Sequence, residues 1–316
     1  MTTTPAVAST PALPGRRFGL ALDRRARIVV ALLILYIIWG TTYLVIRFAL
    51  EGFTPYWLMG LRFLAAGGIL FAALRMGGAP LPTLRQWRSA AIVGGLLLGG
   101  GMGSVALAEE SISSGLVATL VAVAPLWTML FGRLWGRRPL RGEWIGVLLG
   151  LAGVGLLSLE GNLQANPVGI ALVLFASASW SFGSVWMKHL DMPAGAMGSA
   201  AEMLAGGVIL CVMAVVRGEP FPTDPTPGSL LAIAYLIGFG SLLTMTSYSF
   251  LLNNVSATLA TSYSFVNPAI ALFLGAALGG EIITGSALFA LPIILVGVWF
   301  VFRAQSQSAA GTQPTA

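Results

Sequence analysis

Long apolar runs separated by short polar breaks organise most of the sequence. A helix that crosses a bilayer needs about 20 predominantly apolar residues, and ten runs come close to that length. They cover residues 28–46, 56–74, 89–107, 112–132 and 144–159 in the first half, and 168–187, 196–216, 230–252, 255–279 and 285–302 in the second. The pattern predicts an all-α integral membrane protein with ten transmembrane helices. Because the fifth run is short and the break at Asn253 and Asn254 is weak, nine or eleven spans remain as alternatives.

The composition agrees with a membrane protein and argues against a soluble fold. Of the 316 residues, 57% are hydrophobic and 9% are charged, whereas soluble domains carry about a quarter charged residues. Mean hydropathy is +0.87 over the whole chain, so the apolar residues are not confined to one anchor. The net charge is +6, but the cations lie in short loops and form no dense basic face, so no nucleic-acid partner is expected.

The sequence offers little for catalytic, metal or nucleotide chemistry. Cys211 is the single cysteine and His189 the single histidine, so neither an internal disulfide nor a thiolate metal site is expected. An intramembrane enzyme would need paired carboxylates, a His and Cys set or a metal cluster within the spans. The glycines Gly95, Gly99 and Gly103 are expected to allow close helix packing and not to cradle phosphate, because no strand precedes them. We therefore expect no enzyme, no catalytic residue, no metal and no cofactor.

The chain ends predict a retained first helix and two tails. Arg24, Arg25 and Arg27 precede an apolar run of nineteen residues, which is longer than a signal-peptide core and is followed by no small-residue cleavage site. The expected organisation is a cytoplasmic N-terminal tail (1–27), two five-helix repeats (28–160 and 161–303) and a disordered C-terminal tail (304–316).

Loop charges predict the orientation, because cytoplasmic loops of membrane proteins collect Arg and Lys. If the N-terminal tail lies inside, fourteen of the seventeen cations also lie inside, namely Arg16, Arg17, Arg24, Arg25, Arg27, Arg75, Arg85, Arg88, Arg133, Arg137, Arg138, Arg141, Lys188 and Arg303. The outer side then receives Arg47 and Arg217 together with Glu51, Glu109, Glu110, Glu160, Glu219, Asp224 and Glu281. This asymmetry predicts a multi-pass protein of the bacterial inner membrane with both termini in the cytoplasm.

The two halves of the sequence resemble each other after a shift of about 140 residues. Residues 61–70 resemble residues 201–210, Trp39 falls near Trp180, and Pro125 aligns with Pro268. Three matches in the same order favour a duplication. Five spans per half would place the second half in the opposite orientation, giving two inverted five-helix repeats. Such repeats are a recurring plan of secondary transporters that work by alternating access.

Several motifs make the chain similar to a known family. They are L-Y-I-I-W-G-T-T-Y-L-V-I-R (35–47), L-R-F-L-A-A-G (61–67), V-A-P-L-W (123–127), L-A-T-S-Y-S-F-V-N-P (259–268) and G-G-E (279–281). The chain resembles the EamA family of ten-helix exporters in the drug/metabolite transporter superfamily, and within it the YedA-like branch, over residues 30–303. The resemblance implies export of amino acids, drugs or other metabolites. Arg137 and Arg138 replace the acidic residue usual after the fourth span, so any role of that residue does not carry over.

Two charged residues fall inside predicted spans. A carboxylate at the bilayer midplane costs about 2.5 to 3.5 kcal/mol on an insertion scale, so Glu202 needs compensation. It is interpreted either as a protonatable or amine-binding group in the cavity, or as a carboxylate paired with an Arg that fixes helix packing. Arg62 occupies the repeat-related position and could pair with Glu202. It could also reach the interface by snorkelling, or bind the carboxylate of a cargo.

The polar and aromatic residues of the spans predict a weakly polar cavity. Serine, threonine and asparagine concentrate in the eighth and ninth spans, which is too much polarity for lipid-facing helices. The candidate cavity residues are Trp39, Tyr43, Trp180, Tyr248, Ser262, Tyr263 and Asn267. Each could instead be structural, since hydroxyls often bond to their own helix and aromatics often form interfacial belts. Pro125 and Pro268 are expected to kink their spans, either as hinges or as static bends.

These features favour a secondary transporter that exports small metabolites, with neutral or aromatic amino acids as the expected cargo. The expected partners are a small-molecule substrate and the lipid bilayer, with a proton as the candidate coupling ion. Efflux of drugs, nucleosides or other metabolites by the same fold is the first alternative. A membrane scaffold or lipid-handling protein is the second, although neither would need the polar eighth and ninth spans.

Overall fold

The computed structural model describes residues 23–112, 114–158, 166–279 and 285–310. Every secondary-structure element in these ranges is a helix, and no strand occurs among them. This confirms the all-helical fold class for the described part of the chain. The predictions for the outer parts of both tails (1–22 and 311–316), for Glu160 and for the Gly280 and Glu281 positions of the G-G-E motif lie outside the described residues.

The helices follow the predicted apolar runs closely. The first half contains α1 (Arg24–Ile34), η1 (Leu35–Trp39), α2 (Gly40–Ala49), α3 (Pro55–Met76), α4 (Leu84–Gly94), η2 (Gly95–Gly103), α5 (Ser104–Ala108), α6 (Ser114–Val121), α7 (Ala124–Gly132), η3 (Arg133–Trp135) and α8 (Arg141–Ser158). The second half contains α9 (Pro167–Trp186), η4 (Met187–His189), α10 (Ala196–Arg217), α11 (Pro227–Ile237), η5 (Gly238–Leu243), α12 (Thr244–Asn254), α13 (Ala257–Ala260), α14 (Tyr263–Gly279) and α15 (Gly285–Ala310).

Local sequence explains where these helices begin. The Asp23 side chain accepts a hydrogen bond from the Ala26 amide at 2.6 Å and caps α1. Thr83 and Gln86 form a capping box at the start of α4. Proline stands in the first turn of α3, α7, α9 and α11, where its missing N–H leaves no helical hydrogen bond unmade.

Six helical stretches in the described part are long and apolar enough to cross a membrane. They are Arg24–Ala49, Pro55–Met76, Leu84–Ala108, Pro167–His189, Ala196–Arg217 and Pro227–Asn254. Within α15, Pro292–Val301 is a shorter apolar stretch. These stretches support a multi-pass membrane protein, whereas the count of ten spans stays a prediction.

Three of the long stretches contain a π-helical segment, η1, η2 or η5. A π-helical turn uses i→i+5 hydrogen bonds and is frequent at functional sites. The segments η2 and η5 occupy corresponding places in the two halves, near the shift of 140 residues that relates the sequences. The apolar runs predicted membrane-spanning helices at these places and gave no sign of the π-helical segments.

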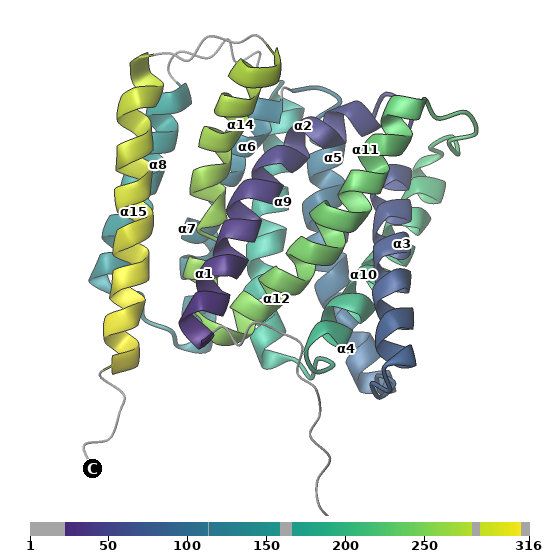
Figure 1. The fold of residues 1–316 in the computed structure, drawn as a ribbon, viewed down its shortest axis with the longest axis horizontal. Coiled ribbons are helices and arrows are strands. Elements are labelled where there is room, and N and C mark those ends of the chain that lie inside the picture. Colours follow the sequence, from purple (N-terminus) through teal and green to yellow (C-terminus); the bar gives the residue numbers. More distant parts are fainter. Residues whose placement is uncertain (1–22, 113, 159–165, 280–284, 311–316) are drawn as a thin grey trace, which may run out of the picture.

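Helices from corresponding places in the two halves pack against each other. The most extensive helix contacts in the described part join α8 with α15 and α3 with α10. The contact of α9 with η2 has its counterpart in the contact of α11 with α2. Figure 1 shows that α1 begins and α15 ends at the same end of the bundle, which we term the lower end. The opposite end is the upper end.

Glycine lets the central helices approach closely. A Cβ atom added to Gly94 would lie 2.6 Å from the Glu202 carbonyl oxygen, and one added to Gly103 would lie 2.7 Å from the Leu210 side chain. Both contacts join the third predicted span to α10. The structure thus places this glycine-rich stretch where the sequence analysis expected close packing.

Pro125 differs from the expected kink within a continuous span. Helix α6 ends at Val121 and α7 begins at Ala124, with Pro125 in its first turn. A proline there starts a new helix and does not bend an existing one. Pro268 does lie inside α14, which follows the short helix α13.

Candidate functional site

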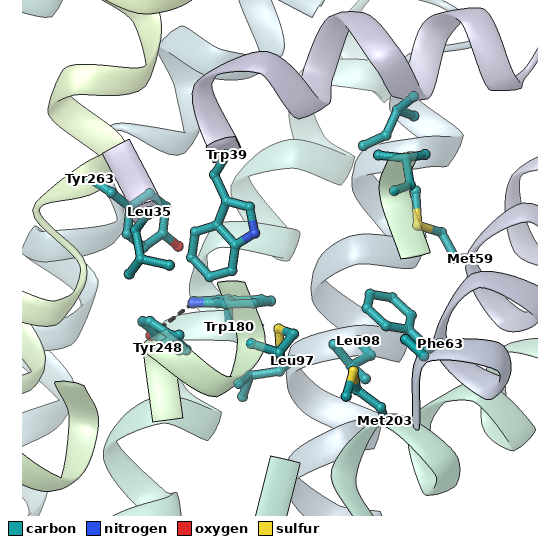
Figure 2. Close-up of a cluster of buried hydrophobic side chains, with 14 of the residues drawn as sticks. Leu35, Trp39, Met59, Phe63, Leu97, Leu98, Trp180, Met203, Tyr248 and Tyr263 are labelled. Atoms are coloured by element: carbon teal, nitrogen blue, oxygen red, sulfur yellow. Dashed lines mark hydrogen bonds between the residues drawn. The ribbon is translucent and has the colours of Figure 1, made fainter. Parts of the chain in front are cut away.

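Four aromatic rings meet in the middle of the bundle. They belong to Trp39, Trp180, Tyr248 and Tyr263, which lie on η1, α9, α12 and α14. The Trp39 ring centroid lies 5.4 Å from that of Trp180, 5.3 Å from that of Tyr248 and 4.5 Å from that of Tyr263. Figure 2 shows the Trp39 ring above that of Trp180, with both tyrosines to one side. We call these four residues the aromatic cluster.

Hydrogen bonds fix the lower part of the aromatic cluster. The Trp180 indole N–H donates to the Tyr248 hydroxyl oxygen at 2.9 Å. The same hydroxyl lies 2.6 Å from Ser184 Oγ, which also donates to the Trp180 carbonyl at 2.7 Å. All three side chains are more than nine-tenths buried. Buried N–H and O–H groups are therefore satisfied within this part of the site.

The Gly240 carbonyl gathers three donors next to the aromatic cluster. Arg62 Nη2 donates to it at 2.6 Å, Thr244 Oγ1 at 2.7 Å and the Trp39 indole N–H at 3.4 Å. Gly240 lies in the π-helical segment η5. A carbonyl in such a segment is less committed to the helix ladder and can accept bonds from side chains. Arg62 thus contacts the site through the backbone carbonyl of Gly240.

Arg62 is fully buried, which is not the snorkelling arrangement weighed in the sequence analysis. Its Nε atom donates to Ser241 Oγ at 2.7 Å, so the guanidinium is held by η5. No ion pair joins Arg62 to Glu202 among the described residues. The expected pairing of these two residues is therefore wrong, because Arg62 finds its partners on a neighbouring helix.

Glu202 lies in a closely packed region of α10. The residue is 1% exposed, and its Oε1 atom has no hydrogen-bond partner in the described part of the chain. The close approach of Gly94 to the Glu202 backbone shows that this turn of α10 is packed against α4. Glu202 is not among the residues that line the central cavity.

A small cavity lies on the upper side of the aromatic cluster. Its walls are formed by Trp39, Thr42, Tyr43, Gly101, Met102, Val105, Val121, Ala124, Ala176, Ser177, Trp180 and Tyr263. Its volume is about 40 Å³, which is enough for a few water molecules but not for an amino acid. Figure 1 shows that α2, α5 and α6, which contribute to these walls, lie toward the upper end.

Asn267 ties α14 to the first predicted span. Its amide nitrogen lies 3.0 Å from the Tyr263 carbonyl and 3.3 Å from the Tyr36 carbonyl. The Asn267 side chain is also hydrogen-bonded to the Tyr43 hydroxyl. Ser262 Oγ lies 2.8 Å from the Tyr36 hydroxyl. Ser262 and Asn267 therefore hold the cavity walls together, while Tyr43 and Tyr263 face the cavity itself.

Basic residues close the lower end around the junction of α12 and α13. Arg24 Nη2 donates to the Asn254 carbonyl at 3.2 Å, and Lys188 Nζ donates to the Val255 carbonyl at 2.8 Å. Arg137 Nη1 donates to Thr258 Oγ1 at 2.9 Å, and the same guanidinium pairs with the buried Glu143. We call Arg24, Lys188 and Arg137 the basic latch. They come from three separate segments, so they join these segments at the lower end.

Part of the site was not predicted from the sequence. Ser177 lines the cavity and its buried Oγ atom has no hydrogen-bond partner in the described structure. Ser177, Ser181 and Ser184 follow one another at helical spacing on α9, which places them on one face. This spacing was a usable signal. The apolar wall residues Met102, Val105 and Val121 carry no such signal, because they look like any other residue of a span.

Comparisons with known proteins bear on the family and the fold of the chain. The family model of the EamA-like transporter family matches residues 26–159 and 167–303. The chain is 45% identical over 272 residues to the uncharacterized inner membrane transporter YedA of Escherichia coli strain K12, covering 86% of this chain and 89% of the relative. It is 26% identical over 297 residues to a probable amino-acid metabolite efflux pump of Salmonella typhimurium, covering 86% and 94%. A solved crystal structure superposes with a TM-score of 0.73 at 19% identity, covering 90% of this chain and 99% of the other.

Proposed function

The chain belongs to the EamA-like transporter family, within the drug/metabolite transporter superfamily and its YedA-like branch, and we propose that this inner-membrane transporter exports neutral or aromatic amino acids. The observation that carries the cargo class is the aromatic cluster beside the central cavity. Tryptophan and tyrosine rings provide large apolar contact areas and attract cations through their faces. Such walls suit an amphiphile with an apolar side chain and an amine.

Alternating access is the mechanism that the fold supports. In this proposal ten spans form two inverted repeats, with both termini in the cytoplasm and the lower end as the cytoplasmic face. The cavity lies above the aromatic cluster, and the basic latch closes the chain below it. Opening the lower end would require the latch residues to release the junction of α12 and α13. Pro125 lies in the first turn of α7 and Pro268 in the second turn of α14, so both follow breaks between helices, where small rotations need little loss of hydrogen bonding.

The candidate residues have distinct roles in this proposal. Trp39, Trp180 and Tyr263 contact the cargo. Tyr248 orients Trp180 through the bond to its indole N–H. Arg62 keeps η5 against Trp39 and does not meet the cargo.

The remaining candidates act around the cargo. Tyr43 completes the upper wall, while Ser262 and Asn267 keep α14 against the first span. Glu202 remains a candidate proton-coupling carboxylate, because it is buried without an ion-pair partner among the described residues.

Exchange in proteoliposomes tests the cargo class. Vesicles are preloaded with single neutral or aromatic amino acids, and uptake of the same radiolabelled species is compared with empty vesicles. Exchange of a subset would support the proposal. If nucleosides or cationic drugs exchange and amino acids do not, the cargo class is wrong and the first alternative takes its place. If a folded protein exchanges none of these, a scaffold or lipid-handling role is favoured.

A further inference from the structure

Glu109 is a further buried carboxylate, at the upper end of the third predicted span. The residue directly follows α5 and is 6% exposed. Neither of its carboxylate oxygens has a hydrogen-bond partner in the described part of the chain. The loop charges predict Glu109 among the acidic residues of the outer side, and its burial is a finding of the structure. A buried carboxylate without a partner is costly and needs a cation or a proton to compensate it.

Helical spacing places Glu109 on the side of the cavity. Met102 and Val105 line the cavity, and Glu109 follows Val105 by four residues. The Glu109 amide donates to the Val105 carbonyl at 3.0 Å, so helical geometry continues to this point. Residues three and four apart share one helix face. Glu109 therefore stands one turn above Val105, at the cavity rim.

Two polar groups of α2 lie within electrostatic reach of Glu109. One is Arg47, which is exposed, and the other is the cavity residue Tyr43. No ion pair forms between Arg47 and Glu109, so the carboxylate is near a cation without being neutralised by contact. Burial raises the pKa of Glu109 well above its ordinary value, and the nearby Arg47 guanidinium opposes this rise in pKa.

We propose that Glu109 binds the ammonium group of the cargo at the upper rim of the cavity. This inference rests on the proposed function and names the residue that recognises the amine. The aromatic cluster lies lower, where the Trp180 ring packs beside Gly101, and would receive the apolar side chain. An ammonium group offers three donors and would satisfy the carboxylate oxygens that the protein leaves unpaired. The exposed Arg47 would compete weakly, because its charge is screened by water.

The chain provides a matched control in Glu110, the next residue. Glu110 is exposed, so Glu110→Gln removes the same charge from the same end of the bundle without touching the cavity rim. Glu109→Gln keeps the size of the side chain and removes its charge. Both variants are first checked for folding by gel filtration and thermal unfolding in detergent.

Recognition of the ammonium group is measured by how strongly two analogues inhibit the exchange of phenylalanine. Phenethylamine keeps the ammonium group, and 3-phenylpropionate lacks it. In the wild type and in Glu110→Gln, phenethylamine should inhibit and 3-phenylpropionate should inhibit at least about tenfold less, since a bond to a charged group is worth about tenfold or more. Glu109→Gln should raise the KM for phenylalanine by about tenfold or more and abolish the preference between the analogues. An unchanged preference in Glu109→Gln would overturn the inference.

A second measurement, the increase in Tm that phenethylamine causes, distinguishes an error in the amine site from an error in the proposed function. If wild-type protein exchanges no amino acid but is stabilised against heat by phenethylamine, and Glu109→Gln alone loses this stabilisation, the amine site stands and the cargo class is wrong. If phenethylamine stabilises Glu109→Gln as well as the wild type, or stabilises neither, the amine site is wrong. Should Glu109→Gln fail to fold, Glu109→Asp provides the second variant, which should retain the preference for the amine with weaker binding.

Discussion

The indole rings of Trp39 and Trp180 contact each other edge to face, with an interplanar angle of 83°. The two residues stand at matching places in the two halves of the sequence. Trp39 reaches the Gly240 carbonyl in η5, while a Cβ atom on Gly101 in η2 would lie 3.0 Å from the Trp180 ring. Each tryptophan thus packs on the π-helical segment of the other half. A movement of one half would therefore displace the tryptophan ring that belongs to the other half.

Trp180→Phe should weaken transport while the protein still folds. The substitution keeps an aromatic ring and removes the N–H that donates to Tyr248. One neutral hydrogen bond contributes about 1 kcal/mol, so thermal unfolding should shift by only a few degrees. Exchange of aromatic amino acids should show a higher KM, because the ring is no longer oriented. Trp186→Phe, on the same helix but outside the cavity, is the control, and equal KM changes in both variants would contradict the role of Trp180.

Arg62→Lys should destabilise the protein despite keeping the charge. An ammonium group cannot reproduce the two directed bonds of the guanidinium to Gly240 and Ser241. The loss should amount to about 2 kcal/mol, as expected for a charged donor removed from buried acceptors. Chemical or thermal unfolding in detergent measures it. Arg85→Lys alters an exposed side chain and should be neutral, and a stable Arg62→Lys protein would show that η5 does not depend on this contact.

Lys188→Met should loosen the lower end. The exposed Lys188 ammonium donates to the Val255 carbonyl, and such a bond at the surface contributes about 1 kcal/mol. In a Cys211→Ser background, a cysteine placed at buried Ser249 should react about fivefold faster with a membrane-impermeant maleimide when Lys188 is replaced. Arg85→Met removes a cation from the same end and should leave the rate unchanged. If both variants react at the wild-type rate, the latch does not close this face.

The thermal stability of Glu109→Gln relative to the wild type should increase with pH. Burial raises the pKa of Glu109 in the folded protein, so the folded state binds its proton more tightly than the unfolded state. The stabilising contribution of the protonated form is complete below the unfolded pKa and is lost as pH rises through the folded pKa. Gln carries no such proton, so the difference in Tm between variant and wild type should grow between pH 4.5 and pH 8. A difference that is constant across this range would show that Glu109 titrates normally.

Two tryptophans show what the sequence predicted of the site, which is their position in the bundle, while their contact with a cargo stays a prediction. Trp39 and Trp180 stand past the centres of their runs, which argued against an interfacial belt, and both rings lie in the aromatic cluster. The all-helical class followed from hydropathy, because only helices and closed barrels satisfy the backbone within lipid. The structure adds that related helices such as α3 and α10 pack together.

Other features depend on contacts that no sequence pattern encodes. For Arg62 the sequence left pairing with Glu202, snorkelling and cargo binding open, but its partners on η5 are 178 and 179 residues away along the chain. Glu109 stands in a polar dipeptide with Glu110, and only tertiary packing buries the first and exposes the second. The break before Pro125 was invisible because the apolar run continues through it.

The π-helical segments η2 and η5 also determine how a change of chain length in these spans would affect the structure. Each π-helical segment rotates the helix above it relative to the helix below it. Side chains at the two ends of one span therefore point in directions that a regular α-helix would not give them. A deletion of one residue inside η2 or η5 could be absorbed by converting the segment toward an ordinary α-helix, because a π-helical turn holds about one residue more than an α-helical turn. The surrounding backbone would keep its place while the face presented to the other half turned. A change in the length of either segment would therefore alter the shape of the cavity without any change in the side chains that line it.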